Sequence, residues 1–126
     1  METDVIVLGS GASALTAALA AKGHGSDVMV FEKADQIGGT SAWSGGMIWV
    51  PNNSHMIAAG IKDSREEALT YLQSLSHDLI RRELAESFVD HGPEMVNWLE
   101  ENTSVRFQLV ADFPDYHPEH PGGKPS

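Results

Sequence analysis

The chain contains no cysteine, and this absence excludes several kinds of structure and chemistry. Without thiols, the protein can form neither a disulfide framework nor a zinc site with thiolate ligands, and no cysteine can act as a nucleophile. A chain that makes no use of disulfides also suits the reducing interior of a cell, so the expected location is cytoplasmic.

Basic residues are scarce and long apolar runs are missing, which excludes two further classes of partner. The 126 residues include 8 Lys and Arg against 18 Asp and Glu, so the formal net charge is −10. Such a surface repels phosphate backbones and anionic membranes, and binding to nucleic acid is therefore not expected. No apolar run approaches the roughly 20 residues that a membrane-spanning helix needs.

The first third of the chain is typical of a strand, a glycine turn, a helix and a second strand. Residues 5–8 (Val-Ile-Val-Leu) form an unbroken apolar run, the pattern of a strand buried on both faces of a parallel sheet. Small and helix-favouring residues predict a helix over 12–22, and residues 27–32 predict the second strand, joined by a right-handed crossover. The expected fold class is therefore α/β, with a Rossmann-like β-α-β unit in an incomplete doubly wound parallel sheet.

The glycine turn carries the pattern Gly9-x-Gly11-x-x-Ala14, which matches the dinucleotide-binding fingerprint. Gly9 permits the tight turn, Gly11 lets the backbone approach a diphosphate, and the small Ala14 lets the helix pack closely on the sheet. The N–H groups at the helix start and the helix dipole would then hold the phosphates. Glu32 ends the second strand about 20 residues further on, where a carboxylate can accept hydrogen bonds from a ribose diol.

Residues 33–51 are rich in glycine and hydroxyl side chains, with tryptophan and methionine between them. This composition is too apolar for a solvated linker and too glycine-dense for a long helix. We therefore expect a loop with a short helical turn that lies against something flat. Lys22 and Lys33 are expected to be solvated rather than to bind a 2′-phosphate, which disfavours NADP.

The middle of the chain predicts helices. A capping-box pattern within residues 63–67 predicts a helix start. Residues 78–89 predict a second helix, and Pro93 predicts its end and the start of a third. The alternating residues 105–110 predict a half-exposed strand before a tail rich in proline, histidine and glycine.

Residues 44–52 read Ser-Gly-Gly-x-x-Trp-Val-Pro-Asn, within a stretch from 32 to 53 that resembles the FAD-binding region of the fumarate reductase and 3-ketosteroid Δ1-dehydrogenase family. That nine-residue portion makes the ketosteroid dehydrogenase branch the closer match. The resemblance continues through residues 63–68 and through Pro-Asp-Tyr-His-Pro-Glu at 114–119, so it covers nearly the whole chain. It implies a Rossmann-like FAD-binding unit followed by a helical segment.

The resemblance also implies which residues bind the cofactor. In that family the amides and hydroxyls of residues 39–41 lie along the diphosphate and ribityl chain, and residues 44–46 pass beside the isoalloxazine. No histidine lies between residues 33 and 53, so the FAD is expected to be bound non-covalently. The expected cofactor-binding residues are Gly9, Gly11, Ala12, Ser13, Ala14, Glu32, Lys33, Gly39, Thr40, Ser41, Ser44, Gly45 and Gly46.

Tyr116 matches a tyrosine that the ketosteroid dehydrogenases place at the steroid site. The resemblance implies that it assists proton removal at C2 while a hydride leaves C1 for flavin N5, which makes Tyr116 the candidate catalytic residue. The alternative is a loop tyrosine packed at a turn. His117 and His120 follow with Glu119 between them, but their proline-broken spacing and the lack of a fixed helix face favour no metal site.

The whole chain is expected to be the N-terminal part of one FAD-binding domain. Its segments are the nucleotide- and flavin-binding residues 1–53, a helical segment over 54–104, and a strand and tail over 105–126. A central strand needs neighbours on both sides, and two or three strands do not provide them. The chain is therefore expected to be a piece of a longer flavoenzyme and to lack turnover alone.

The resemblance implies an oxidoreductase that uses FAD to dehydrogenate or reduce an activated C–C bond. Its partner would be a small-molecule substrate, either a 3-ketosteroid or an unsaturated acid such as fumarate. Two alternatives remain open. The chain could be a stand-alone module that binds ADP-containing cofactors without redox chemistry, or a subunit whose sheet is completed by a partner chain.

Overall fold

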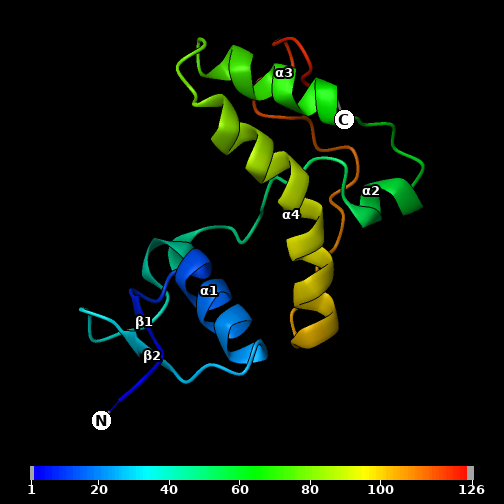
Figure 1. Ribbon diagram of the computed structural model, residues 1–126. Helices are drawn as coiled ribbons and strands as arrows, with labels where there is room; N and C mark the ends of the chain where they lie inside the picture. The colour runs from blue at the N-terminus through cyan, green and yellow to red at the C-terminus, as the bar shows by residue number, and fades with distance from the viewer. Residues whose placement is uncertain (1, 125–126) are drawn as a thin grey trace. The chain divides into compact units, whose positions relative to one another are not determined.

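A computed structural model describes residues 2–124, and the chain divides into two units, residues 1–48 and 49–126. The first unit contains strand β1 (Val5–Leu8), helix α1 (Ala12–Gly23), strand β2 (Val28–Phe31) and the short 3₁₀ helix η1 (Gly39–Trp43). The two strands pair in parallel from Val5↔Val28 to Leu8↔Phe31, and α1 lies beside them (Figure 1). The expected α/β class and the expected helical turn in the glycine-rich loop are both confirmed.

Strand β1 is much more exposed than its apolar sequence predicts. Ile6 and Leu8 expose 59% and 79% of their surface, because within residues 2–124 the sheet contains only β1 and β2. A two-stranded sheet with one helix beside it cannot cover both faces of a strand. The expected burial of β1 on both faces is therefore not met within the described part of the chain.

The second unit is helical up to residue 102. Helix α2 spans Ser54–Ala58, and Asn53 caps it by accepting hydrogen bonds from two backbone N–H groups. Helix α3 spans Arg65–Leu75, and the Ser64 hydroxyl accepts a hydrogen bond from the N–H of Glu67, as the capping-box pattern predicts. Helix α4 spans Arg82–Asn102 and packs against α3 (Figure 1).

Pro93 lies inside α4 and does not end it, so the expected break at this residue is wrong. A proline has no N–H to donate, and its ring crowds the carbonyl four residues earlier, which disfavours a helix interior. However, one face of α4 is buried on both sides of the proline, at Ala85, Val89, Gly92, Val96 and Leu99. Gly92 packs so closely that an added Cβ would lie 3.1 Å from Val50 Cγ1. Burial of this continuous stripe outweighs the local penalty at Pro93.

The start of this helix also differs from the expected residue 78. His77 and Asp78 have φ of 50° and 62°, a left-handed backbone that a helix cannot include. These two residues follow the end of α3, and α4 begins only at Arg82. The two helices expected over 78–101 are thus one helix that starts later.

Residues 105–110 form no strand, which corrects the expectation from their alternating pattern. The N–H of Phe107 donates to Glu100 Oε1 at 2.8 Å, and the Arg106 guanidinium donates to the carbonyls of residues 100, 103 and 105. A strand needs a neighbouring strand for its backbone groups, and none lies beside this segment in the described part of the chain. Side chains near the end of α4 take that place.

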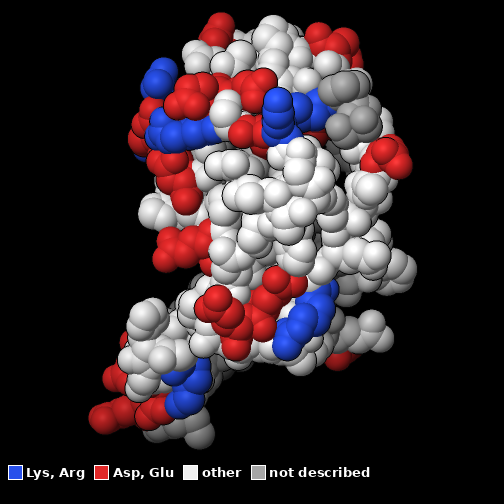
Figure 2. All heavy atoms as spheres, turned by 90° about the vertical axis from the view of Figure 1, so that its right-hand side faces the viewer, with Lys and Arg blue, Asp and Glu red and all other residues white. Residues whose placement is uncertain are grey.

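Carboxylates dominate the surface charge. Five basic side chains pair with a carboxylate: Lys22, Arg65, Arg81, Arg82 and Lys124. On the face drawn in Figure 2, acidic side chains recur and basic ones accompany only some of them. The resulting field attracts cations and repels polyanions. Between residues 2 and 124, no helix is both long and apolar enough to cross a membrane.

Candidate functional site

The glycine turn after β1 has the backbone that the fingerprint requires. Gly9 has φ of +99°, a region open to glycine, and its N–H donates to the carbonyl of Phe31 at 2.7 Å. Gly11 has extended backbone and precedes the first residue of α1. The turn therefore leads directly from the carboxyl end of β1 into the N-terminus of a 12-residue helix.

Two of the first three N–H groups of α1 are available to an anion. The N–H of Ala12 donates to Ser41 Oγ at 3.0 Å. Among residues 2–124, no group accepts a hydrogen bond from the N–H of Ser13 or Ala14. Because the helix dipole adds positive potential at this end, these donors suit a phosphate.

Ser10 connects the glycine turn to the rest of the site. Its side chain is 2% exposed, and its hydroxyl donates to Glu32 Oε2 at 2.5 Å and accepts from the N–H of Gly38 at 2.9 Å. One buried hydroxyl thus joins the turn after β1, the carboxylate after β2 and the start of the glycine-rich loop. Ser10 is not among the site residues expected from the sequence, although a hydroxyl between the two fingerprint glycines was an available signal.

Glu32 is held as a carboxylate. The Ser10 hydroxyl lowers the pKa of Glu32, and the N–H of Ala34, which donates to Oε1 at 2.9 Å, lowers it further. Each carboxylate oxygen can accept a second hydrogen bond, so the group keeps acceptor capacity for a ribose hydroxyl. At pH values above the ordinary pKa of a glutamate carboxyl, the lowered pKa of Glu32 stabilises the folded state. This stabilisation is lost as the pH falls through the lowered pKa.

The glycine-rich loop lies directly against the glycine turn. A Cβ added to Gly39 would lie 3.9 Å from the backbone of Gly11, and Gly38 has φ of +112°. A Cβ at Gly38 would also come within 2.6 Å of Ala42 Cβ, so only glycine fits there. Ser44 then donates to the carbonyl of Ser41 at 2.8 Å, which closes the end of η1.

The first unit therefore brings most of the expected cofactor residues onto neighbouring elements. The residues of the turn and helix start, Glu32, and the loop from Gly39 to Ser44 are joined by the hydrogen bonds of Ser10 and Ser41. Lys33, Gly45 and Gly46 are exposed, and Gly46 N–H donates to Ser44 Oγ at 3.2 Å. Thr40 lies on η1 and is also exposed.

Tyr116 belongs to the second unit. Its side chain is 79% exposed and meets Phe113 edge-on, with ring centroids 6.3 Å apart. The preceding residue is firmly held, because Asp115 accepts hydrogen bonds from Trp49 Nε1 at 2.7 Å and from the N–H of Lys124 at 2.8 Å. Tyr116 is thus an exposed phenol on an anchored backbone.

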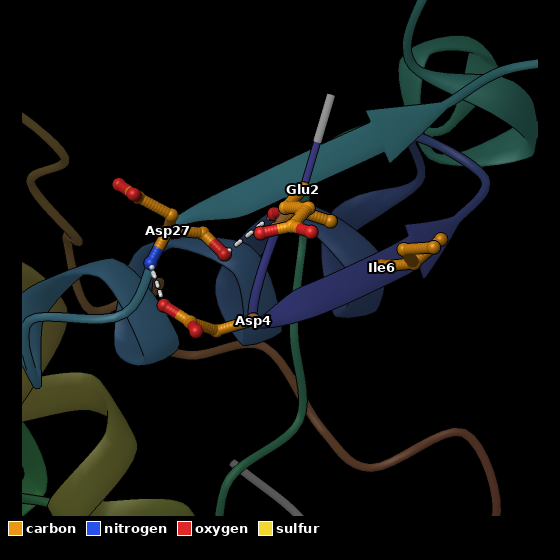
Figure 3. Close-up of a pocket in the computed structure, with 5 residues that line it drawn as sticks. Glu2, Asp4, Ile6 and Asp27 are labelled. Carbon is orange, nitrogen blue, oxygen red and sulfur yellow. Dashed lines mark hydrogen bonds between the residues drawn. The ribbon is translucent and has the colours of Figure 1, made fainter.

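An open hollow lies at the other end of the strands from the glycine turn (Figure 3). Its lining includes three carboxylates, those of Glu2, Asp4 and Asp27. Asp4 Oδ2 accepts a hydrogen bond from the N–H of Asp27 at 2.8 Å, which holds the strand starts together. An acidic lining opposes a diphosphate, so the glycine turn remains the candidate nucleotide site.

Replacing Ser10 with alanine is expected to raise the pKa of Glu32 toward its ordinary value, because the largest cause of the lowered pKa is removed. The pH dependence of the Glu32 side-chain carboxyl resonance, followed by NMR, measures this change. Ser26→Ala is the matched control, since the Ser26 hydroxyl makes no hydrogen bond within residues 2–124. An unchanged Glu32 titration in Ser10→Ala would show that the bridge does not form.

The chain resembles known proteins along nearly its whole length. The sequence model of a family described as "FAD binding domain" matches residues 4–124. The chain is 41% identical over 125 residues to a 3-oxosteroid 1-dehydrogenase of Mycolicibacterium smegmatis, across 99% of this chain and 22% of that protein. It is 46% identical over 119 residues to a 4-oxocyclohexanecarboxylate 2-dehydrogenase of Sinomonas cyclohexanicum, across 94% of this chain and 21% of that protein.

A solved dehydrogenase structure resembles this chain in three dimensions as well. The crystal structure of 3-ketosteroid delta1-dehydrogenase from Sterolibacterium denitrificans, in complex with 1,4-androstadiene-3,17-dione, matches with a TM-score of 0.91 and 44% identity. The match covers 98% of this chain and 22% of that one. The chain thus spans about 22% of the length of the proteins that it resembles.

Proposed function

Because the chain belongs to the FAD binding domain family, we propose that its first unit binds the ADP part of FAD. The observation that carries this proposal is the Ser10 bridge, which joins the glycine turn, Glu32 and the glycine-rich loop. In the proposed complex, the N–H groups of Ser13 and Ala14 face the diphosphate and Glu32 accepts from the adenosine ribose.

The flavin part of FAD would lie along the second half of the glycine-rich loop. Gly39, Thr40 and Ser41 offer close backbone and hydroxyl donors to the diphosphate and ribityl chain. Residues 44–46 would pass beside the isoalloxazine, and Lys33 would lie near the adenosine end. Because residues 33–53 contain no histidine, we propose that the FAD is held without a covalent bond.

We propose that the protein dehydrogenates a cyclic ketone at the C–C bond beside the carbonyl. The names of the two relatives, a 3-oxosteroid and a 4-oxocyclohexanecarboxylate dehydrogenase, share a ring that carries an oxo group. Bound FAD would supply the hydride acceptor. Tyr116 would act on the proton that must leave the neighbouring carbon, as an exposed phenol on an anchored backbone can. A 3-ketosteroid fits this substrate class better than an unsaturated acid.

The stand-alone cofactor-binding module is the second candidate. It is favoured by the hydrogen bonds that join the proposed nucleotide-binding groups within residues 9–44, since one segment of the chain would then suffice to recognise ADP. A partner chain that completes the sheet is the third candidate, favoured by the exposure of Ile6 and Leu8. The three candidates differ in redox behaviour and in oligomeric state.

The proposal is tested by titrating FAD into the purified 126-residue chain and following the quenching of flavin fluorescence. We expect saturable binding that ADP reverses and FMN does not, because the proposed contacts of the Ser10 bridge and of the α1 N-terminus are all with the ADP part. Displacement by FMN as readily as by ADP would contradict the proposed orientation. A 3-ketosteroid that reduces the bound FAD would favour the oxidoreductase over the stand-alone module and would contradict the expected lack of turnover in this chain. A dimer in light scattering would favour the partner chain.

A further inference from the structure

A cluster of nitrogen and oxygen ligands follows Tyr116 and takes no part in the proposed FAD site. It consists of His117, Glu119 and His120, and one ligand atom of each side chain lies within 4.8 Å of the other two. His117 Nδ1 and Glu119 Oε1 are 3.1 Å apart, and the two imidazole rings meet edge-on with centroids 5.6 Å apart. Three residues within four positions thus converge on one point.

The loop that carries these residues has a defined shape, although its sequence predicts none. The N–H of His120 donates to the carbonyl of His117 at 3.0 Å, and the N–H of Gly123 donates to the carbonyl of His120 at 2.9 Å. Pro118 lies between His117 and Glu119, and Pro121 follows His120, so both restrict the backbone of the loop and reduce the entropy lost on ordering. The three side chains therefore lie on no helix face, as expected, but hydrogen bonds within the loop give it a defined shape.

The same loop is attached to α3 at three places. Gly122, with φ of +82°, lies so close that an added Cβ would come within 2.3 Å of the carbonyl oxygen of Glu67. The N–H of His117 donates to the Tyr71 hydroxyl at 3.3 Å. Ser74 Oγ lies 2.7 Å from His120 Nδ1. These contacts hold the cluster against a helix, which pre-organises it for a ligand.

We propose that His117, Glu119 and His120 bind a divalent transition-metal ion, with Zn²⁺ as the fitting ion. Two imidazoles and one carboxylate are a common protein ligand set for zinc, with water as the fourth ligand. In a tetrahedral site with metal–ligand bonds of about 2.0–2.1 Å, two ligands lie roughly 3.3 Å apart. The separation of His117 Nδ1 and Glu119 Oε1, 3.1 Å, is already close to that value.

Ser74 supplies the outer contact that such sites use. A metal-bound histidine is oriented by a hydrogen bond to its other ring nitrogen. The Ser74 hydroxyl occupies Nδ1 of His120, which leaves Nε2 of that ring for the ion. Ser74 is therefore a positioning residue, and the formal net charge of −10 gives the chain a field that favours a cation.

Two other histidine–carboxylate pairs can be compared with the cluster of three ligands. His55 meets Glu100 at 3.0 Å and His91 meets Glu94 at 3.4 Å. Across residues 2–124, neither pair has a third metal-ligating side chain close enough to form a group. The His91 pair is exposed on a helix surface, so it provides a matched control for a histidine–glutamate contact without a metal site.

The test is isothermal titration of ZnCl₂ into the untagged 126-residue chain, purified with chelator and then freed of it. We expect one site with a dissociation constant on the order of micromolar, and Co²⁺ in the same site should give the visible bands of a tetrahedral N/O complex. His120→Ala and Glu119→Gln should each weaken zinc binding by about 100-fold. Ser74→Ala should weaken it by about 10-fold, since outer contacts contribute about 10- to 100-fold in affinity.

His91→Ala should leave the zinc affinity unchanged. The Glu119→Gln variant should keep the fold even if a histidine variant disturbs the loop, because Glu119 is exposed and glutamine has the same shape as glutamate. Circular dichroism of each variant checks this point. Equal loss of binding in His91→Ala and His120→Ala would overturn the proposal, as would unaltered zinc binding in Glu119→Gln and His120→Ala together. Neither outcome depends on FAD binding.

Discussion

Replacing Gly11 with valine is expected to weaken FAD binding to the 126-residue chain by about 100-fold, or about 2.7 kcal/mol. Gly11 precedes α1, and a Cβ built on it would lie 3.5 Å from Ser41 Oγ and 4.0 Å from the carbonyl oxygen of Gly38. The two methyl groups of valine would therefore enter the space between the glycine turn and the loop. That space is where the proposed diphosphate meets the helix N–H groups.

The backbone of Gly11 tolerates this change, because its φ of −69° and ψ of 172° are open to any residue. The loss should thus appear in binding and not in folding. Flavin fluorescence measures the affinity, and circular dichroism checks that α1 still forms. Ala17→Val is the matched control, since Ala17 is an exposed position of the same helix. If both variants bind FAD as the parent does, the glycine turn is not the diphosphate site.

Replacing Tyr71 with alanine is expected to lower the free energy of unfolding of the second unit by about 3 to 5 kcal/mol, the range for removal of a large buried aromatic side chain. Tyr71 is 4% exposed, and its ring centroid lies 5.6 Å from that of Trp49. Its hydroxyl accepts a hydrogen bond from the N–H of His117, so the variant also loses a link between α3 and the tail. Burial raises the pKa of this phenol, which keeps it neutral.

The chain contains a second tyrosine that serves as the control. Tyr116 is 79% exposed, and Tyr116→Ala should change the free energy of unfolding by no more than about 0.5 kcal/mol. Tyr71→Phe keeps the ring and should cost about 1 kcal/mol, the net value of one hydrogen bond. Urea denaturation followed by tryptophan fluorescence measures all three. Equal effects of Tyr71→Ala and Tyr116→Ala would show that Tyr71 is not part of the core.

The elements that sequence patterns predict well are those whose causes are local. The expected strands at 5–8 and 27–32 and the helix at 12–22 differ from β1, α1 and β2 by no more than one residue at each end. The short helical turn expected within 33–51 is η1. The resemblance carried by residues 32–53 is confirmed by the family match over 4–124 and by the related dehydrogenases.

The expectations that failed depend on contacts between distant residues. Pro93 predicts a helix end from its own chemistry, but Gly92 against Val50 and the buried stripe of α4 decide that the helix continues. The alternating residues 105–110 have a strand pattern but no neighbouring strand among the described residues. The hydrophobic pattern of a segment indicates which face the segment can bury. Only the tertiary structure determines which element packs against that face.

The sequence alone determined the β-α-β unit and the FAD-binding family, because a strand, a glycine turn and a helix start are set by residues within a few positions of one another. The tertiary structure decided that Ser10 joins Glu32 and Gly38, which lie 22 and 28 residues away. It also decided that the tail folds onto α3 and brings His117, Glu119 and His120 together. Such sites depend on where distant segments meet, and that position follows from burial and backbone packing, which no local pattern records.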